Sequence, residues 1–211
     1  GPGIRTTLFV KGCPLRCLWC SNPESQNAFP EVMLRSTRCI GCGKCFEVCK
    51  PGAITLIDTG KEFSRYNLEL HRAKCNQCLK CAEVCPSGAI EIVGKYISVE
   101  EAVRELTADS LFYHNSGGGV TVSGGEPLSQ WRFVAEVLRR CHEKGIHTAL
   151  DTCGYAPWHA WQSPLNYTDL VLFDIKHLDS EHHKQGTGVD NALILENLHK
   201  VAAITETWLR V

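Results

Sequence analysis

The cysteines of this chain are numerous and closely spaced. Thirteen of the 211 residues are cysteine, and eleven of these fall between Cys13 and Cys85, in groups with two or three residues between neighbours. Such spacing suits ligands of a shared metal centre better than separate disulfides, whose geometry is demanding. A secreted disulfide scaffold would usually be shorter, with its cysteines spread along the chain. The pattern therefore favours metal-bound thiolates in a reducing, anaerobic cytoplasm.

The first group is a three-cysteine loop that follows the apolar run Thr6–Val10. It reads Cys13-Pro-Leu-Arg-Cys17-Leu-Trp-Cys20. Three soft thiolates on one tight loop suit a [4Fe–4S] cluster. Because three ligands are one too few for four irons, one iron would keep an open position, by the logic that separates catalytic from structural zinc sites. A structural zinc site completed by a remote Cys or His is the alternative.

The other eight clustered cysteines form an internal repeat, in which the copies are offset by 36 residues. Each copy reads C-x2-C-x2-C-x3-C, the spacing of two-cluster ferredoxins, where the fourth cysteine binds the other copy's cluster. One predicted cluster therefore takes Cys39, Cys42, Cys45 and Cys85, and the other takes Cys75, Cys78, Cys81 and Cys49. Zinc is disfavoured because its usual loop lengths differ. We expect an α+β ferredoxin-like domain with two [4Fe–4S] clusters at residues 36–93.

Outside residues 36–93, short apolar runs alternate with amphipathic segments. The runs have the composition of buried parallel strands and are Thr6–Val10, Val120–Ser123, His147–Asp151, Leu170–Asp174 and Thr207–Val211. Helical stripes of apolar residues are predicted in Val99–His114, from Trp131 to Cys141, and from Ile194 to Val201. Gly186-Thr187-Gly188 reads as a turn before a helix, with no chemistry assigned.

This strand–helix alternation predicts an α/β fold with a parallel sheet, either a barrel or an open relative of one. The cysteine repeat interrupts the first strand-to-helix connection. We therefore expect residues 1–35 and 94–211 to form one domain, with residues 36–93 inserted into it. Five strands are recognisable, and a sixth is expected beyond Val211, so the chain reads as a fragment.

Polar residues and glycines follow three of the predicted strands. Ser123-Gly124-Gly125-Glu126 comes after the second strand, Asp151-Thr152 ends the third, and Asp174-Ile175-Lys176 ends the fourth. Ligand sites form at these strand ends in barrels, and glycine lets a ligand approach the backbone. An Asp or Lys is costly there unless it is paired. A mutual ion pair that only closes the barrel mouth is therefore the alternative to a ligand site.

Composition excludes several classes of protein. The chain is 44% hydrophobic and 21% charged, which is typical of a globular protein. Its 22 basic and 23 acidic residues give a net charge of −1, which argues against nucleic acid as a partner. No stretch approaches the ~18 continuous apolar residues of a membrane span. The nine histidines form no spaced pair on an evident helix, and Cys141 and Cys153 are left out of the expected ligand set.

The motifs resemble those of the radical S-adenosylmethionine (SAM) superfamily. Its hallmark is C-x3-C-x2-C with an aromatic residue before the third cysteine, a position that Trp19 fills. The resemblance narrows to the glycyl-radical-enzyme activating enzymes, because Gly1-Pro-Gly-Ile-Arg-Thr-Thr leads into Lys11-Gly-Cys13-Pro-Leu-Arg-Cys17. It implies a partial (β/α)6 radical SAM barrel that carries a ferredoxin-like insert.

The resemblance also implies a SAM site. The Gly-Gly-Glu segment matches a motif that binds the amino group of SAM, and Asp-Ile-Lys matches a D-x-K motif that contacts SAM. Asp151 matches a D-T motif near the SAM carboxylate. The implied catalytic residues are Cys13, Cys17, Cys20 and Lys176. The implied SAM contacts are Trp19, Cys20, Ser21, Gly124, Gly125, Glu126, Asp151, Asp174, Ile175 and Lys176.

The activity implied by the resemblance is reductive cleavage of SAM to methionine and a 5′-deoxyadenosyl radical. That radical takes a hydrogen atom from a backbone glycine of a partner enzyme, and no residue identifies which one. Three [4Fe–4S] clusters are implied, with flavodoxin or ferredoxin as electron donor and a monomeric chain. The insert would relay electrons, dock the partner, or both. The alternatives are a radical SAM enzyme with a small-molecule substrate and a non-catalytic electron-transfer protein of the ferredoxin type.

Overall fold

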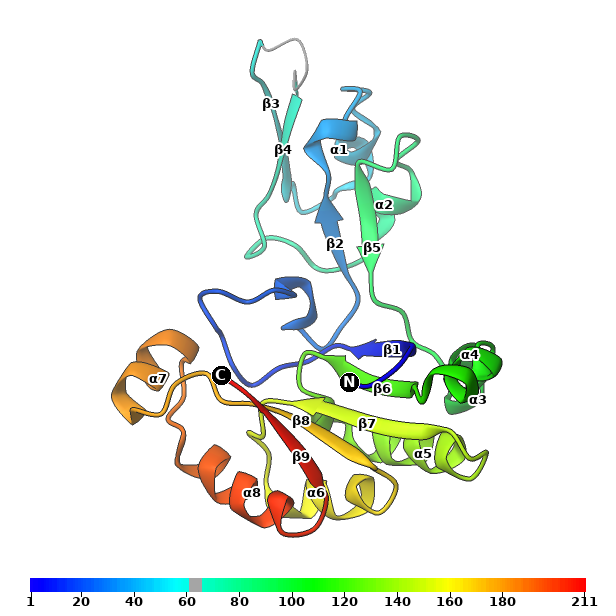
Figure 1. The fold of residues 1–211 in the computed structure, drawn as a ribbon. Helices are drawn as coiled ribbons and strands as arrows, with labels where there is room; N and C mark the ends of the chain where they lie inside the picture. Colours follow the sequence, from blue (N-terminus) through cyan, green and yellow to red (C-terminus); the bar gives the residue numbers. More distant parts are fainter. Residues whose placement is uncertain (61–65) are drawn as a thin grey trace. The chain divides into compact units, whose positions relative to one another are not determined.

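The computed structural model describes residues 1–60 and 66–211 (Figure 1). These residues divide into two compact units. Gly1–Ala28 and Ile97–Val211 form the first, here called the sheet unit, and Phe29–Tyr96 forms the second, here called the cysteine-repeat unit. No helix among the described residues is long and apolar enough to cross a membrane.

A five-stranded parallel sheet forms the centre of the sheet unit, with the strand order β1-β6-β7-β8-β9. The strands are β1 (Arg5–Val10), β6 (Gly119–Gly124), β7 (His147–Thr152), β8 (Leu170–Asp174) and β9 (Glu206–Arg210). They coincide with the five expected runs to within about one residue at each end, because the apolar residues of these runs suit strands with one face buried in the core. The α/β fold with a parallel sheet is therefore confirmed.

Helices connect these strands. They are α3 (Val99–Thr107), α4 (Ser110–Ser116), α5 (Trp131–His142), α6 (Trp158–Leu165), α7 (Ser180–Thr187) and α8 (Ala192–Ala202), with short 3-10 turns η1 (Pro23–Ser25) and η3 (Pro127–Gln130). Ser98 starts α3 with a capping box. Its Oγ accepts the amide of Glu101 at 3.1 Å, and the Glu101 carboxylate accepts the amide of Ser98 at 2.9 Å.

The single helix expected over Val99–His114 is wrong, since α3 and α4 are separate helices. Tyr113 of α4 supplies a physical reason. Its hydroxyl donates to the carbonyl of Leu106 at 2.7 Å and lies 2.5 Å from Thr6 Oγ1 of β1. This pair of bonds folds α4 back against α3 and β1, which a continuous helix could not do.

The two faces of the sheet differ, because successive strand residues point to opposite sides. On one face, side chains such as Val122, Leu150, Val171 and Phe173 join the main hydrophobic core together with Trp161. Helices α5, α6 and α8 lie on one side of the sheet (Figure 1) and contribute residues to this core. The opposite face carries the polar strand residues described below.

The cysteine-repeat unit contains two antiparallel strand pairs and two short helices. Its elements are β2 (Glu31–Leu34), η2 (Ser36–Arg38), α1 (Lys44–Val48), β3 (Ile54–Asp58), β4 (Tyr66–Leu70), α2 (Lys80–Glu83) and β5 (Ile90–Val93). β2 pairs with β5, and β3 pairs with β4. The unit extends beyond 36–93 at both ends, because β2 precedes the repeat and pairs with the strand that follows it. Its core combines apolar residues with buried Cys45 and Cys81.

The packing of Trp161 in the main core of the sheet unit predicts how its truncation changes the free energy of unfolding. Trp161 is fully buried and stacks on Phe173, with ring centroids 6.0 Å apart and planes 7° apart. We expect Trp161→Ala to lower the unfolding free energy by about 3–5 kcal/mol, because truncation leaves a large cavity. Urea unfolding followed by circular dichroism measures this. Leu111→Ala, at a side chain that is 69% exposed, is the matched control, with an expected change within about 0.5 kcal/mol. Equal effects of the two substitutions would contradict the assigned core.

Candidate functional site

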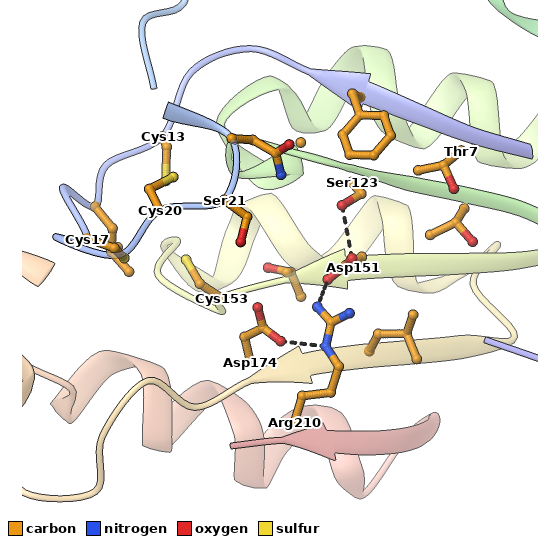
Figure 2. A pocket seen from close by; sticks show the side chains of 18 of the residues that line it. Thr7, Cys13, Cys17, Cys20, Ser21, Ser123, Asp151, Cys153, Asp174 and Arg210 are labelled. Atoms are coloured by element: carbon orange, nitrogen blue, oxygen red, sulfur yellow. Dashed lines mark hydrogen bonds and ion pairs between the residues drawn. The ribbon is translucent and has the colours of Figure 1, made fainter. Parts of the chain in front are cut away.

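A pocket of about 670 Å³ lies in the sheet unit, along one face of the parallel sheet and over the carboxyl ends of its strands. All five strands and the three-cysteine loop contribute to its lining (Figure 2). This is the position at which parallel α/β sheets generally form ligand sites.

Alternation along the strands supplies the polar residues of the pocket. On β1, β6 and β8, the side chains that line it are spaced two apart and belong to the face opposite the main core: Arg5, Thr7, Phe9, Thr121, Ser123, Leu172 and Asp174. The register places Phe9 opposite Ser123 and Asp174 opposite Arg210. A sequence pattern of period two therefore separates the pocket from the core.

The three-cysteine loop brings Cys13, Cys17 and Cys20 to the same pocket (Figure 2). Two backbone hydrogen bonds hold the start of the loop after β1. The amide of Gly12 donates to the carbonyl of Ser25 at 2.8 Å, and the amide of Cys13 donates to that of Gln26 at 3.0 Å. Burial raises the pKa of the Cys17 thiol above its ordinary value. A positive centre at this loop would be needed to hold three thiolates together.

Cys153 is a pocket residue that sequence reasoning left out. It follows β7, is buried, and lines the pocket beside the loop. A hydrogen bond from the Cys153 thiol lowers the pKa of Cys13. The sequence signal for a place in the pocket is that Cys153 follows Asp151-Thr152 at the end of a strand. A single cysteine there is also typical of a small core residue, so the signal is weak.

Gly124, the last residue of β6, and Gly125 form the part of the pocket wall next to the loop. Gly124 has a φ of +115°, and a Cβ there would lie 2.3 Å from the carbonyl oxygen of Val10; a Cβ on Gly125 would lie 2.4 Å from that of Gly12. The amide of Gly125 donates to Val10 O at 2.8 Å, and that of Glu126 donates to Gly12 O at 2.7 Å. Only glycine allows this turn to pack directly against the start of the three-cysteine loop.

Glu126 is placed differently from its two glycine neighbours. It is fully buried and does not line the pocket. Its carboxylate accepts hydrogen bonds from the Leu128 amide at 3.0 Å, Thr152 Oγ1 at 2.7 Å and the Cys153 amide at 2.9 Å. Burial raises its pKa. Glu126 therefore joins the loops after β6 and β7, while its direct contact with SAM stays a prediction, as does that of Ile175, which is buried outside the lining.

Charged residues at the ends of β7, β8 and β9 form one network (Figure 2). Arg210 donates to Asp174 Oδ1 at 2.5 Å and also pairs with Asp151, which accepts a bond from Ser123 Oγ at 2.9 Å. Lys176 Nζ donates to Asp174 Oδ2 at 2.6 Å. Sequence reasoning expected a mutual pairing of the aspartates and Lys176 as the alternative to a ligand site. It missed Arg210, whose role depends on strand register.

This network sets the charge state of its members. Burial raises the pKa of Asp151, and the charge of Arg210 opposes that rise. Burial alone would lower the pKa of Lys176, but the hydrogen bond and charge of Asp174 outweigh it, so the pKa lies above its ordinary value. Lys176 therefore remains a cation at neutral pH.

The cysteine-repeat unit contains a second, smaller cavity. Its lining includes Cys39, Cys42, Cys45 and Cys85, so the fourth cysteine comes from the second copy of the repeat. Around Cys81, the neighbouring thiols include Cys75 and Cys49, and burial raises the pKa of Cys81 to about 11. Each of these two neighbourhoods therefore combines cysteines from both copies of the repeat, while the full ligand sets stay a prediction.

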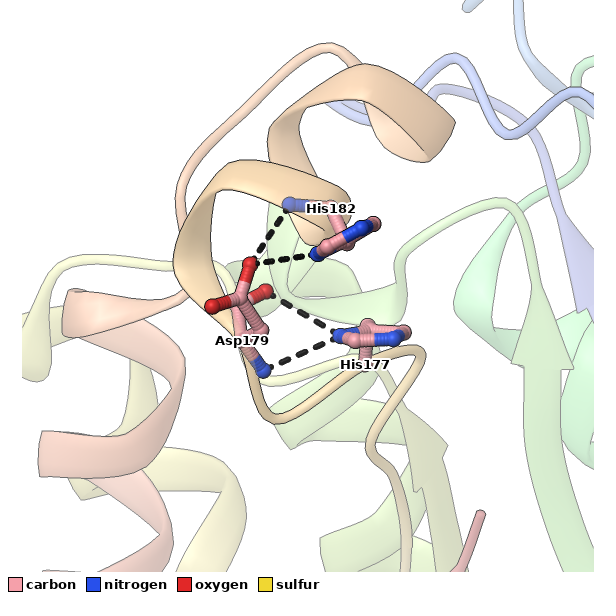
Figure 3. A group of neighbouring side chains, drawn as sticks. All are labelled: His177, Asp179 and His182. Carbon is pink, nitrogen blue, oxygen red and sulfur yellow. Dashed lines mark hydrogen bonds and ion pairs between the residues drawn. The ribbon is translucent and has the colours of Figure 1, made fainter.

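A third group combines His177, Asp179 and His182 at the start of α7 (Figure 3). All three residues are exposed. Asp179 is the N-cap of α7, since its Oδ1 accepts the amide of His182 at 2.9 Å, and the same oxygen lies 2.7 Å from His182 Nδ1. The His177 Nδ1 accepts the amide of Asp179 at 3.0 Å. These contacts are those of a helix start, and we assign no ligand to the group.

The Asp151–Arg210 pair predicts a pH dependence. An acid whose pKa is higher in the folded than in the unfolded state destabilises the folded protein increasingly as pH rises between those two values. Arg210→Ala removes the charge that opposes the raised pKa of Asp151. We therefore expect this substitution to reduce the unfolding free energy more at pH 8 than at pH 5. Urea unfolding at both pH values measures it, and Arg210→Lys, which keeps the charge, is the control. Equal losses at both pH values for Arg210→Ala would contradict the assignment.

Comparison with family models gives two matches. A model described as a 4Fe-4S dicluster domain matches residues 38–89, and a model described as the radical SAM superfamily matches residues 75–209. The second match starts within the cysteine-repeat unit and does not extend back to the three-cysteine loop.

Several characterised relatives align along nearly the whole chain. A (2S)-3-sulfopropanediol dehydratase activating enzyme from Klebsiella oxytoca is 48% identical over 96% of this chain and 63% of its own length. A trans-4-hydroxy-L-proline dehydratase activating enzyme from Clostridioides difficile is 47% identical over 94% of this chain and 64% of its own. A benzylsuccinate synthase activating enzyme from Thauera aromatica is 45% identical over 96% of this chain and 61% of its own length. The chain therefore spans less than two thirds of the length of these relatives.

Among solved structures, a domain of a pyruvate-formate lyase-activating enzyme from Bacteroides vulgatus is 40% identical over 44% of this chain and 59% of its own, with a TM-score of 0.42. That score is too low to bear on the fold. The sequence matches are sufficient without it. With a superfamily model covering residues 75–209 and identities of 45 to 48% along nearly its full length, this chain belongs to the radical SAM superfamily.

Proposed function

We propose that this chain carries the SAM-cleaving centre of a glycyl-radical-enzyme activating enzyme. The observation that supports the proposal most directly is that one pocket is lined by three cysteines of a C-x3-C-x2-C loop, two glycines and the Asp174–Lys176 pair. These groups come from separate strands, and nothing in a purely structural role requires them to meet. The relatives, all named as activating enzymes, point to the same function.

The residues present fit a [4Fe–4S] cluster with an open iron. Three thiols face a pocket of about 670 Å³, which leaves room for a ligand of the size of SAM beside a cluster. The donor set is entirely sulfur, which suits iron–sulfur chemistry. When bound, the cluster would supply one electron for cleavage of the SAM sulfonium, giving methionine and the radical that removes a hydrogen atom from a partner's glycine.

The chain's own residues would bind and orient SAM. Gly124 and Gly125 would present their backbone to the ligand, in a turn that packs against the carbonyls of Val10 and Gly12. Arg5, Lys176 and Arg210 are the cations of the pocket lining, and Asp151 and Asp174 are its carboxylates, so both charged groups of an amino acid can find a partner. Trp19 and Ser21 line the pocket next to the cysteines and would contact the rest of the ligand. The chemistry is supplied by the cofactors, so a general acid–base pair is not required.

We further propose that residues 36–93 are an inserted ferredoxin-like domain with two [4Fe–4S] clusters, which brings the number of clusters to three. The mixed grouping of cysteines from both copies supports this arrangement. The insert would pass electrons from a flavodoxin or ferredoxin, and the five strands of the sheet unit would be part of a (β/α)6 barrel in a monomeric, cytoplasmic protein. An electron-transfer protein without catalysis is the second candidate, and the well-formed pocket argues against it.

Cleavage of SAM by the complete protein tests the main proposal. After anaerobic reconstitution and reduction, we expect 5′-deoxyadenosine from the wild type and none from Cys17→Ala. Because the insert clusters share no ligand with the loop, the variant should retain about eight of about twelve irons. Cys141→Ala, at a buried core thiol far from these motifs in sequence, is the control and should behave as the wild type. Fully loaded wild type that binds SAM but forms no deoxyadenosine would favour the electron-transfer candidate.

Iron content also tests the exchange of ligands between the two copies of the repeat. Cys45 and Cys85 would serve one cluster, whereas Cys45 and Cys49 would serve different clusters. We therefore expect the double variant Cys45→Ala/Cys85→Ala to lose about four irons and Cys45→Ala/Cys49→Ala to lose about eight. Iron analysis of the purified proteins distinguishes the two. The reverse order of losses would mean that each copy binds its own cluster.

A further inference from the structure

The three-cysteine loop rests on the end of α7, a segment to which the sequence assigned no chemistry. The amide of Arg16 donates to the carbonyl of Thr187 at 2.7 Å, and that of Leu18 donates to the carbonyl of Gly186 at 3.0 Å. These bonds use carbonyls at the carboxyl end of a helix, which have no partner within the helix itself. The loop is therefore fixed from outside between its first and third cysteines.

Gly186 also lies against the side chain of Trp19 in the three-cysteine loop. A Cβ at this position would lie 2.6 Å from Cη2 and 2.7 Å from Cζ3 of Trp19, closer than real contacts allow. Gly186 is a helical residue whose φ is not in the left-handed region. The backbone conformation at residue 186 therefore does not require glycine. Glycine is required there because the Trp19 ring occupies the space that a Cβ would need.

The ring that occupies this space also lines the pocket. Trp19 is 54% exposed and belongs to the pocket lining together with Cys17 and Cys20. The contact with Gly186 involves the far edge of the ring, so an added methyl group would displace the indole rather than the backbone. Displacement would change the shape of the pocket next to the cysteines.

The helix itself is held firmly. Thr187 is fully buried, and its Oγ1 donates to the carbonyl of His183 at 2.8 Å. At the other end of the helix, Asn191 Nδ2 donates to the carbonyls of His177 and Leu178. Because residue 177 directly follows Lys176, α7 connects the end of β8 to the three-cysteine loop.

From these contacts we infer that Gly186 is a positioning residue for SAM binding: it leaves the space in which the Trp19 ring sits and thereby sets the wall of the pocket. The inference rests on the proposed function. It assigns no chemical step to Gly186, which acts only through Trp19.

The test compares Gly186→Ala with wild type in the complete, anaerobically reconstituted protein. We expect about tenfold weaker SAM binding by equilibrium dialysis, as for other directly coupled pairs, with unchanged iron content. The melting temperature should stay equal or rise, because alanine favours a helix over glycine. Gln185→Ala, at the neighbouring exposed position, is the matched control and should bind SAM as the wild type does.

A double-mutant cycle separates the ring from other causes. In a Trp19→Leu background the added methyl group meets no indole, so Gly186→Ala should change SAM binding by less than about twofold. An equal loss in both backgrounds, or a Gly186→Ala protein that binds SAM like the wild type, would overturn the inference.

A second signal keeps this test independent of the proposed function. In protein labelled with 5-fluorotryptophan, Trp19→Leu identifies the fluorine resonance of Trp19. Gly186→Ala should shift that resonance and leave the other tryptophan resonances in place. A Trp19 resonance that does not shift in Gly186→Ala would overturn the inference. A wild-type protein with a full iron content that binds no SAM would instead overturn the proposed function, and the fluorine resonance would still report the contact between Gly186 and Trp19.

Discussion

The alternation of side chains along five parallel strands is the constraint on which the rest of the sheet unit depends. Residues of one parity, such as Val122 and Phe173, are buried in the core, while their neighbours Ser123 and Asp174 line the pocket. A shift of register by one residue would exchange the two sets and bury carboxylates among apolar side chains. The same packing that stabilises the sheet therefore also fixes the position of every polar group at its carboxyl ends.

The cysteine-repeat unit depends on a different kind of stabilisation. Its core is small, and cysteines make up a substantial part of it, among them buried Cys45 and Cys81. A unit of this size buries little apolar surface and generally needs covalent or metal cross-links. Iron bound by cysteines from both copies would close loops that the hydrophobic core alone holds weakly. Folding and cluster assembly in this unit are therefore expected to be one process.

Much of the architecture could be predicted from the sequence, because its strands are short, mainly apolar runs between amphipathic segments and its cysteine spacings are specific. What could not be predicted depends on contacts between distant residues. The break between α3 and α4 follows from Tyr113, and Arg210 enters the pocket only because register sets it opposite Asp174. Helix α7 has a polar sequence without an apolar stripe, so its support of the three-cysteine loop was not visible. Glu126 turned inward because Thr152 and Cys153 supply donors behind it.

The pairing of Arg210 with both aspartates has a consequence for how any ligand enters the pocket. Asp151 and Asp174 already have a cation between them, and Lys176 balances the remaining charge, so these four side chains sum to zero. The ammonium of a ligand that carries both an ammonium and a carboxylate would have to replace a cation that already pairs with an aspartate, and its carboxylate would have to replace an aspartate that already pairs with Arg210 or Lys176. No unpaired charge of this network is left for the ligand to neutralise. This network of four side chains would itself contribute little long-range attraction, and the further cation of the lining is Arg5. Discrimination among ligands by the network should therefore depend on whether they can replace its internal pairs and on the shape of the cavity.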